Sequence, residues 1–152
     1  LEKKVVYSPL KGTVKKLSEA EDEAFASGAL GKGAAVVPVE GKVVAPVDGT
    51  IVTLFPTNHA IAIETNSGVE ILIHVGLDTV QLDGKYFYPK VKEGDKIKKG
   101  DLMLEFDIDE IKKAGYVLTT PIIVTNTDEY LDVLEMKKEN VEFGDELITI
   151  VK

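Results

Sequence analysis

Residues 55–80 (FPTNHAIAIETNSGVEILIHVGLDTV) hold both histidines of the chain, His59 and His74, and are the most informative part of the sequence. An apolar, β-rich run lies on each side of residues 66–68 (Asn-Ser-Gly). Two such runs joined by Asn, Ser and Gly are typical of a β-hairpin. The stretch therefore predicts a hairpin with one histidine on each strand.

Two registers of this hairpin are open. A two-residue loop at residues 66–67 pairs His59 directly with His74, and cross-strand neighbours have Cβ atoms about 4.5–5.5 Å apart. A three-residue loop with Gly68 in a left-handed bulge shifts the pairing by one residue and is expected to send the two rings to opposite faces. The spacing of the isoleucines on both strands suits the second register better. A compensating bulge would then restore the pairing.

Composition narrows the classes of function. The formal charge of −8 argues against a nucleic-acid partner, because binding to a phosphate backbone needs clustered Lys and Arg. The absence of Cys excludes a disulfide framework and a Cys-ligated zinc site. No apolar run approaches the roughly 18 residues of a membrane helix, and no secretory segment opens the chain. We expect a cytoplasmic protein without direct membrane insertion.

Short strands separated by Gly and Pro turns account for most of the chain. Residues 18–25 predict a short helix with Ser18 as N-cap, and residues 107–115 predict another that ends at a glycine. Strands are predicted at residues 5–7, 13–17, 34–39, 42–45, 49–55, 86–91, 96–98, 102–106, 117–125 and 146–151, and residues 128–134 are ambiguous. The pattern predicts an all-β, antiparallel sandwich or barrel-like single domain over residues 1–152 with one or two short helices.

The two histidines suggest phosphoryl chemistry. A neutral imidazole is a good nucleophile toward a phosphoryl donor when its reactive nitrogen keeps the lone pair. The other ring nitrogen must then donate its proton, often to a backbone carbonyl. His59 would be a non-covalent partner of His74, because its N–H can hydrogen-bond a phosphoryl oxygen and spread the charge of a loose transition state. Thr57 lies two residues before His59 and can orient the other nitrogen of that ring.

Residues 68–80 (GVEILIHVGLDTV) also carry a family resemblance. They resemble the phosphorylation-site signature of the glucose-type enzyme IIA proteins (IIA-Glc) of the phosphoenolpyruvate:sugar phosphotransferase system. Residues 55–59 (FPTNH) resemble the second-histidine motif of that family. Further matches at residues 25–26, 44–49, 94–101 and 120–129 extend the resemblance over nearly the whole chain.

The resemblance implies a phosphotransferase component. His74 would accept a phosphoryl group on Nε2 from the phosphohistidine of HPr and pass it to a cysteine of a IIB domain, which drives sugar uptake and phosphorylation. No cofactor and a monomeric state are expected.

The resemblance further implies a partner-binding surface around His74. Its expected members are Phe25, Phe55, Leu72, Val75, Gly76 and Asp78. Gly76 would leave room for the backbone to approach the ring, and Asp78 would recognise a basic residue of a partner. An ordinary core role is an equal alternative for Leu72 and Val75, because the family often has Phe at both positions.

Two other readings stay open. Residues 135–137 (Glu-Met-Lys) are similar to the Met-Lys pair of biotinyl and lipoyl-like carrier domains, with Lys137 as the modified residue, although such domains are about half this length. His59 and His74 with a carboxylate could also form a His-ligated metal site, but the chain has no third histidine. The sugar, and whether the chain is free-standing or part of a larger permease, are not predicted.

Overall fold

The computed structural model describes residues 2–152. These residues form fourteen β-strands, two short α-helices and three 3-10 turns. The strands are β1 (Lys3–Tyr7), β2 (Gly12–Lys16), β3 (Lys32–Pro38), β4 (Lys42–Val44), β5 (Gly49–Leu54), β6 (Ala60–Glu64), β7 (Glu70–His74), β8 (Phe87–Pro89), β9 (Lys96–Ile97), β10 (Leu102–Phe106), β11 (Thr120–Val124), β12 (Asp132–Glu135), β13 (Asn140–Val141) and β14 (Glu146–Val151). The helices are α1 (Glu23–Ala26) and α2 (Ile108–Lys113), and the 3-10 turns are η1 (Leu17–Glu19), η2 (Thr79–Leu82) and η3 (Thr127–Glu129).

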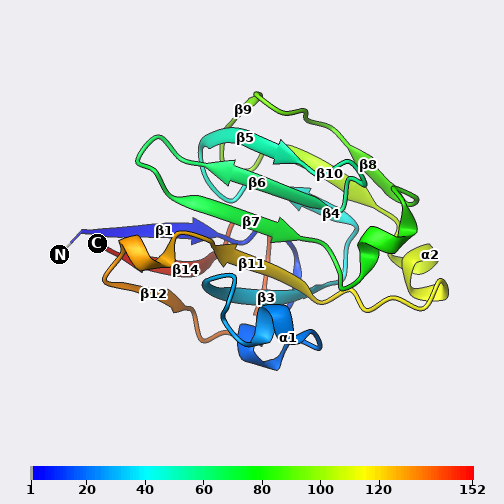
Figure 1. Cartoon of the computed structure of the whole chain (residues 1–152), viewed down its shortest axis with the longest axis horizontal. Coiled ribbons are helices and arrows are strands. Elements are labelled where there is room, and N and C mark those ends of the chain that lie inside the picture. The colour runs from blue at the N-terminus through cyan, green and yellow to red at the C-terminus, as the bar shows by residue number, and fades with distance from the viewer. Residues whose placement is uncertain (1) are drawn as a thin grey trace.

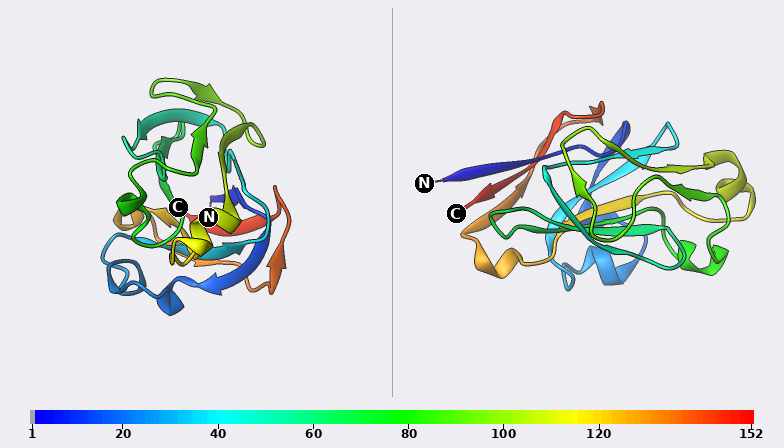
Figure 2. Two further views of the ribbon diagram at one scale, coloured as in Figure 1. Left: turned by 90° about the vertical axis from the view of Figure 1, so that its right-hand side faces the viewer. Right: turned by 90° about the horizontal axis from the view of Figure 1, so that it is seen from above.

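The strands form three antiparallel sheets. The largest has the order β13-β2-β3-β11-β7-β6-β5-β9, and the two smaller sheets have the orders β1-β14-β12 and β4-β10-β8. In Figure 1, β5, β6, β7, β11 and β3 lie one below another as the central part of the large sheet. Figure 2 shows the sheets folded around a common interior. The predicted class, an all-β antiparallel sandwich with few helices, is confirmed.

The β6–β7 hairpin supplies the centre of the core. Ile61 lies opposite Ile73 and Ile63 opposite Ile71, and each of the four side chains is 1% exposed. Side chains alternate between the two faces of a strand, so this spacing directs every isoleucine of the hairpin to the interior. β-branched residues also favour the extended backbone, so local propensity and burial agree here.

The two short helices differ in how well they were predicted. Residues 18–25 do not form one helix capped by Ser18. Instead, η1 is followed by α1, whose N-cap is Asp22, with its carboxylate accepting from the Ala24 N–H. The expectation for residues 107–115 is confirmed, because Asp107 caps α2 and Gly115 ends it in the left-handed region at φ 94°.

Most predicted strands are present with shifted ends. The strand expected at residues 117–125 is shortened to β11, and residues 86–91 contribute only β8. The ambiguous residues 128–134 divide into η3 and the start of β12, and the two-residue strand β13 was not predicted. The strand ends differ because each strand extends only as far as a neighbouring strand pairs with it.

The two ends of the described chain lie side by side at one end of the molecule (Figures 1 and 2). The Lys152 N–H donates to the Glu2 carbonyl over 2.9 Å. Strand β7 runs toward the opposite end, where α2 lies, and finishes there at His74. Among residues 2–152, the helices are all too short to cross a membrane.

Candidate functional site

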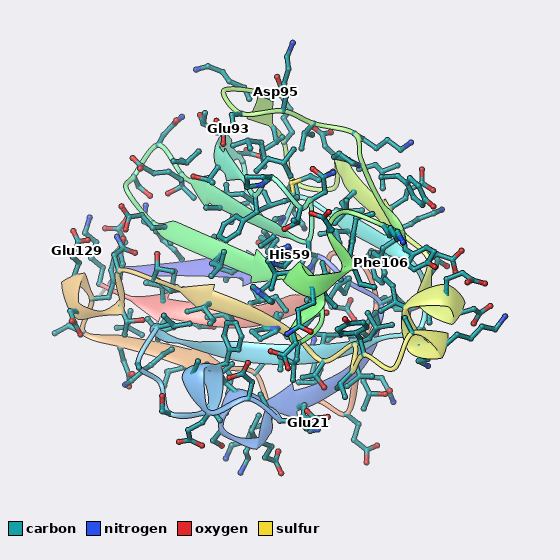
Figure 3. The ribbon with its side chains drawn as sticks, turned by 45° about the vertical axis from the view of Figure 1, so that its right-hand side comes forward. Glu21, His59, Glu93, Asp95, Phe106 and Glu129 are labelled. Carbon is teal, nitrogen blue, oxygen red and sulfur yellow. The ribbon has the colours of Figure 1, made fainter. Side chains whose placement is uncertain are left out.

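His59 and His74 meet where β6 begins and β7 ends. Their ring centroids are 4.7 Å apart, and the ring planes are inclined at 81°. The His59 side chain is 1% exposed, whereas His74 is partly exposed. Figure 3 shows His59 beside the tip of β7, with Phe106 to its right and Glu21 below it. The pair therefore combines a buried imidazole with one that a partner can reach.

The hairpin uses the three-residue loop. Ala60 pairs with His74, the Gly68 N–H donates to the Thr65 carbonyl over 3.0 Å, and Gly68 lies in the left-handed region at φ 92°. The alternative in which His59 pairs directly with His74 is wrong, and the β6–β7 ladder contains no compensating bulge.

The expectation that this register would separate the two rings is also wrong. His59 precedes β6, and the residue before it, Asn58, has φ 60°. Side-chain alternation applies only inside the ladder, so a histidine just outside it can turn its ring toward the neighbouring strand end. The last bond of the hairpin, from the Val75 N–H to the His59 carbonyl over 2.8 Å, ties the two histidine segments together.

The proton on His74 is held at Nδ1. This nitrogen lies 2.8 Å from the Gly76 carbonyl oxygen. A carbonyl oxygen can only accept a hydrogen bond, so Nδ1 must be the protonated nitrogen of a neutral ring. The lone pair of neutral His74 is consequently at Nε2, so the ring would act as a nucleophile through this nitrogen.

Thr57 holds the second ring. Its Oγ1 lies 2.8 Å from His59 Nδ1. The hydroxyl can donate to that nitrogen or accept from it. When Thr57 donates, the proton of neutral His59 is at Nε2, where it can serve as a hydrogen-bond donor to a bound anion.

Burial keeps both imidazoles neutral. Burial and, to a smaller extent, the neighbouring His74 lower the pKa of His59 to about 4, against a hydrogen bond to the Thr57 backbone that acts in the opposite direction. Burial also lowers the pKa of His74, while the bond to Gly76 and the charges of Asp22 and Asp78 act in the opposite direction. Both rings are therefore uncharged at neutral pH, and His74 keeps a lone pair available for attack.

Comparison with known proteins identifies the family. Residues 4–130 match the family model of the phosphoenolpyruvate-dependent sugar phosphotransferase system, EIIA 1. The chain belongs to this EIIA family. The resemblance seen in the two histidine motifs is thus confirmed, and the chain is a component of a phosphotransferase system.

Relatives of this EIIA chain are larger proteins. It is 52% identical over 151 residues to a PTS system beta-glucoside-specific EIIBCA component of Halalkalibacterium halodurans, covering 99% of this chain and 24% of that protein. It is 53% identical over 128 residues to the component of the same name from Bacillus subtilis, covering 84% of this chain and 21% of that protein. The chain thus spans about a quarter of the length of these relatives.

A solved structure matches the EIIA chain over almost its whole length. It is the glucose permease IIA from Mycoplasma capricolum, with a TM-score of 0.91 and 39% sequence identity. The match covers 98% of this chain and 96% of that one. The sandwich described above is therefore the fold of a glucose-type IIA domain.

The predicted partner-binding residues of the EIIA chain divide into two groups. Phe25 packs on the His74 ring with a centroid distance of 4.9 Å, and Phe55 packs edge-on against His59 at 5.6 Å. Leu72 is partly exposed on β7, and the Asp78 side chain is exposed beyond it. These four residues lie around the histidine pair, although Phe25 is only 6% exposed and packs in a second core cluster.

Val75 and Gly76 do not belong to that surface. Val75 is 1% exposed and lies in the main core, so the expectation of an apolar docking contact from its side chain is wrong. Gly76 is buried as well, at φ 76°, and its carbonyl accepts from His74 Nδ1, whereas the resemblance implied only that Gly76 leaves room for the backbone near the ring.

Sequence reasoning missed four neighbours of the histidine pair. Phe87 approaches His59 with a centroid distance of 6.4 Å, and Asp22 acts on the pKa of His74. Thr79 and Thr120 are fully buried, and their hydroxyls bond to the backbone next to Gly76. Both threonines lie in segments that resemble the family, residues 68–80 and 120–129, but no role was predicted for them.

The two other readings are not favoured in an EIIA chain. Lys137 lies between β12 and β13, which pair with different strands, so it does not occupy the tip of a hairpin. Within residues 2–152, no group of three or more His, Cys, Asp or Glu side chains is arranged to hold a metal ion.

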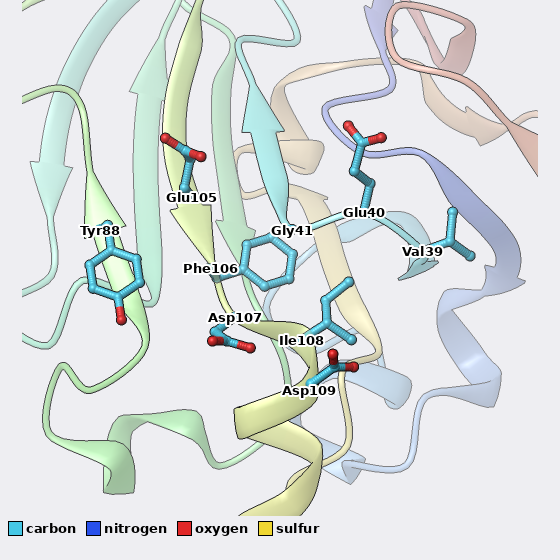
Figure 4. Close-up of a pocket in the computed structure, with 9 residues that line it drawn as sticks. All are labelled: Val39, Glu40, Gly41, Tyr88, Glu105, Phe106, Asp107, Ile108 and Asp109. Atoms are coloured by element: carbon cyan, nitrogen blue, oxygen red, sulfur yellow. The ribbon is translucent and has the colours of Figure 1, made fainter.

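A separate concavity, here called the acidic pocket, lies between β8, β10 and the start of α2 (Figure 4). Its volume is about 470 Å³, and its lining residues are Val39, Glu40, Gly41, Tyr88, Glu105, Phe106, Asp107, Ile108 and Asp109. Phe106 also packs on Phe87, which in turn packs on His59. The acidic pocket and the histidine pair are therefore separated by two aromatic rings.

Proposed function

We propose that residues 1–152 act as one IIA phosphocarrier domain. It accepts a phosphoryl group from phospho-HPr on His74 and passes it to the cysteine of a IIB domain, which drives uptake and phosphorylation of a sugar. The observation that carries the proposal is the 2.8 Å contact between His74 Nδ1 and the Gly76 carbonyl, which leaves the Nε2 lone pair available.

The first transfer is an exchange between two imidazoles. The Nε2 lone pair of His74 attacks phosphorus, the new N–P bond forms as the donor's N–P bond breaks, and the donor ring leaves with the electron pair. His74 keeps its Nδ1 proton throughout, so no base has to remove a proton from the nucleophile.

His59 and Thr57 would support this transfer. With Thr57 donating to Nδ1, the His59 Nε2–H is available to a phosphoryl oxygen, and the 4.7 Å ring separation keeps His59 beside the ring that would carry the phosphoryl group. A fixed donor in a site shielded from water stabilises charge better than a mobile solvent molecule does. In the second transfer, the IIB thiolate attacks phosphorus and Nε2 regains its electron pair.

The partners should meet the exposed side of the pair. Phe55, Leu72 and Asp78 offer partly exposed apolar surface and a carboxylate around His74. Acidic residues beside the reactive histidine favour a partner with basic residues at its docking surface. We further propose a cytoplasmic, monomeric protein without a cofactor. Light scattering of the purified chain should give a mass near 16.5 kDa.

The names of the relatives indicate a sugar class. Two proteins about half identical to this chain are beta-glucoside-specific EIIBCA components, so we assign the receiving IIB domain to a β-glucoside system. Transfer to a β-glucoside IIB domain should be at least several times faster than transfer to a IIB domain of another sugar system. Equal rates would contradict this assignment.

Phosphotransfer with phosphoenolpyruvate, enzyme I and HPr tests the function. Wild type should acquire an acid-labile, base-stable phosphate, and His74→Gln should acquire none. His59→Gln should still be labelled but should transfer to IIB about 100-fold more slowly, because one donor to the phosphoryl oxygens is lost. Thr57→Val should also be labelled and should transfer to IIB about 10-fold more slowly than wild type.

Lys137→Gln is the matched control and should be labelled like wild type. Normal labelling of His74→Gln, or no labelling of wild type, would overturn the proposed function. A biotinyl or lipoyl group on Lys137, found as an acid-stable mass increase, would support the carrier-domain reading instead.

A further inference from the structure

Backbone hydrogen bonds restrain the loop after β7, residues 75–77, on both sides of Gly76. The Val75 N–H donates to the His59 carbonyl, and the Leu77 N–H donates to the Val117 carbonyl over 2.9 Å. Between these two bonds lie the peptide groups Val75–Gly76 and Gly76–Leu77. The second of them supplies the carbonyl that accepts from His74.

Two buried hydroxyls hold the first of these peptide groups at both ends. The Thr79 Oγ1 donates to the Val75 carbonyl, and the Gly76 N–H donates to the Thr120 Oγ1 over 3.3 Å. The Thr120 hydroxyl in turn donates to the Leu118 carbonyl over 2.9 Å, so its role as acceptor toward Gly76 is unambiguous. Both threonines are 0% exposed, and no water competes for these bonds.

The register explains why Thr120 is available. Strand β11 pairs with β7 so that Ile122 lies opposite Ile73, and continuation of this ladder brings Thr120 across from Val75. The regular backbone bonding of this pair of strands stops there. The Thr120 hydroxyl thus supplies the acceptor for the first N–H beyond the ladder.

Gly76 needs such restraints because glycine itself imposes few. Its φ of 76° is outside the usual range of other residues, and a Cβ at this position would be 2.6 Å from the Thr79 Cγ2. The absent side chain leaves the backbone free to rotate about Gly76. Rotation of the Val75–Gly76 peptide group would move the next carbonyl away from His74 Nδ1.

We propose that Thr120 and Thr79 are positioning residues of the phosphoryl-transfer site, which fix the Gly76 carbonyl and through it the protonated nitrogen of His74. This inference rests on the proposed function for its catalytic consequence. Its structural part, the choice of tautomer, stands independently. Both hydroxyls bond to the backbone, and the threonines act on His74 through it.

The tautomer of His74 is the first readout. In the full chain labelled with ¹⁵N-histidine, long-range ¹H–¹⁵N correlation at pH 7.5 should show wild-type His74 with its proton on Nδ1. Thr120→Val has nearly the same shape but lacks the hydroxyl, and a substantial fraction of its His74 should carry the proton on Nε2. Thr120→Ser restores the hydroxyl and should restore the wild-type spectrum.

Transfer kinetics are the second readout. Thr120→Val should accept phosphate from phospho-HPr about 5- to 20-fold more slowly at saturating donor, with KM within about twofold of wild type, because the docking surface is untouched. Thr79→Val should change both readouts in the same direction. Thr119→Val is the matched control: its hydroxyl is also buried but donates to Glu21, and the tautomer should stay as in wild type.

Three outcomes would overturn the inference. The first is a folded Thr120→Val and a folded Thr79→Val that both keep the wild-type tautomer and rate. The second is a tautomer change of equal size in Thr119→Val. The third needs no variant: rapid hydrogen exchange of the Gly76 amide in wild type would show that Thr120 does not hold it. If wild type takes no phosphate, the proposed function fails while the spectra still decide the role of the threonines.

Discussion

The histidine pair and the acidic pocket are two regions of one molecule in which polar side chains have opposite surroundings. In the acidic pocket, Glu105 pairs with Lys90 over 3.3 Å, and both side chains are more than 40% exposed. Asp107 is committed to capping α2. At the histidine pair, by contrast, both imidazoles are neutral, His59 is buried, and His74 Nδ1 is bonded to a carbonyl that can only accept.

This difference shows what distinguishes a reactive site from an open space. Exposed ion pairs contribute little free energy and leave their carboxylates in ordinary surroundings. Burial keeps the imidazoles neutral, and the bond to the Gly76 carbonyl places the lone pair of His74 at Nε2. The volume of about 470 Å³ beside Phe106 carries no comparable arrangement.

Gly76→Ala should have the largest effect on the histidine pair. The new Cβ would lie 2.6 Å from Thr79 and at a φ that disfavours alanine, so the carbonyl that holds His74 should shift. We expect about a 100-fold loss of phosphoryl acceptance, together with about 2 kcal/mol of lost stability. Labelling kinetics and urea unfolding measure the two effects. Gly94→Ala is the control, because Gly94 also has a positive φ but its Cβ would meet nothing within 4 Å.

An unchanged labelling rate in Gly76→Ala would show that the loop tolerates a different backbone path. The tautomer model would then need another acceptor for the Nδ1 proton. Equal loss of labelling in Gly94→Ala would mean that backbone strain alone impairs the protein.

Stability should depend on pH through His59. Its pKa is about 4 in the folded chain and 6.5 in the unfolded chain, so between these values the unfolded state binds the extra proton. The contribution of neutral, buried His59 to the free energy of unfolding is therefore fully present above pH 6.5 and is lost as pH falls toward 4. Between pH 7.5 and pH 4.5 this loss should be about 2–3 kcal/mol.

Urea unfolding of wild type and His59→Gln at the two pH values isolates this effect. The variant should lose less stability on acidification by about that amount, whereas Glu105→Gln should follow wild type. Parallel pH curves for wild type and His59→Gln would show that His59 is not held neutral by burial.

Removing charge from the acidic pocket should have the smallest effect. Glu105→Gln and Asp109→Asn should accept and pass on phosphate within twofold of wild type, with stability changed by about 0.5 kcal/mol or less. The same phosphotransfer assay measures both. A tenfold change in transfer would mean that the rings of Phe106 and Phe87 couple the pocket to His59 and that the two regions are not independent.

The sequence was most informative where a single short-range rule applies. Gly68 favoured a left-handed bulge and the isoleucine spacing favoured the same register, and both agree with the hairpin as found. The cap and terminal glycine of α2 were equally local signals. His59, His74 and Thr57 were found through their motif, and the structure brings them together.

Long-range contacts could not be derived in this way. The meeting of the two rings depends on the path of the chain at Asn58, which has φ 60°. The bond from Gly76 to Thr120 joins residues 44 positions apart. Val75 was indistinguishable from a docking residue, because an apolar side chain in a motif does not reveal which way it points.

The bond between His74 and Gly76 also has a consequence for isotope effects. Because the Nδ1 proton stays on His74 before, during and after transfer, the chemical step moves no proton at the nucleophile. Exchange of H₂O for D₂O should then leave the transfer rate nearly unchanged, and buffers should not accelerate it. Under the proposed function, the same arrangement serves both directions of transfer, because neither direction moves a proton at His74.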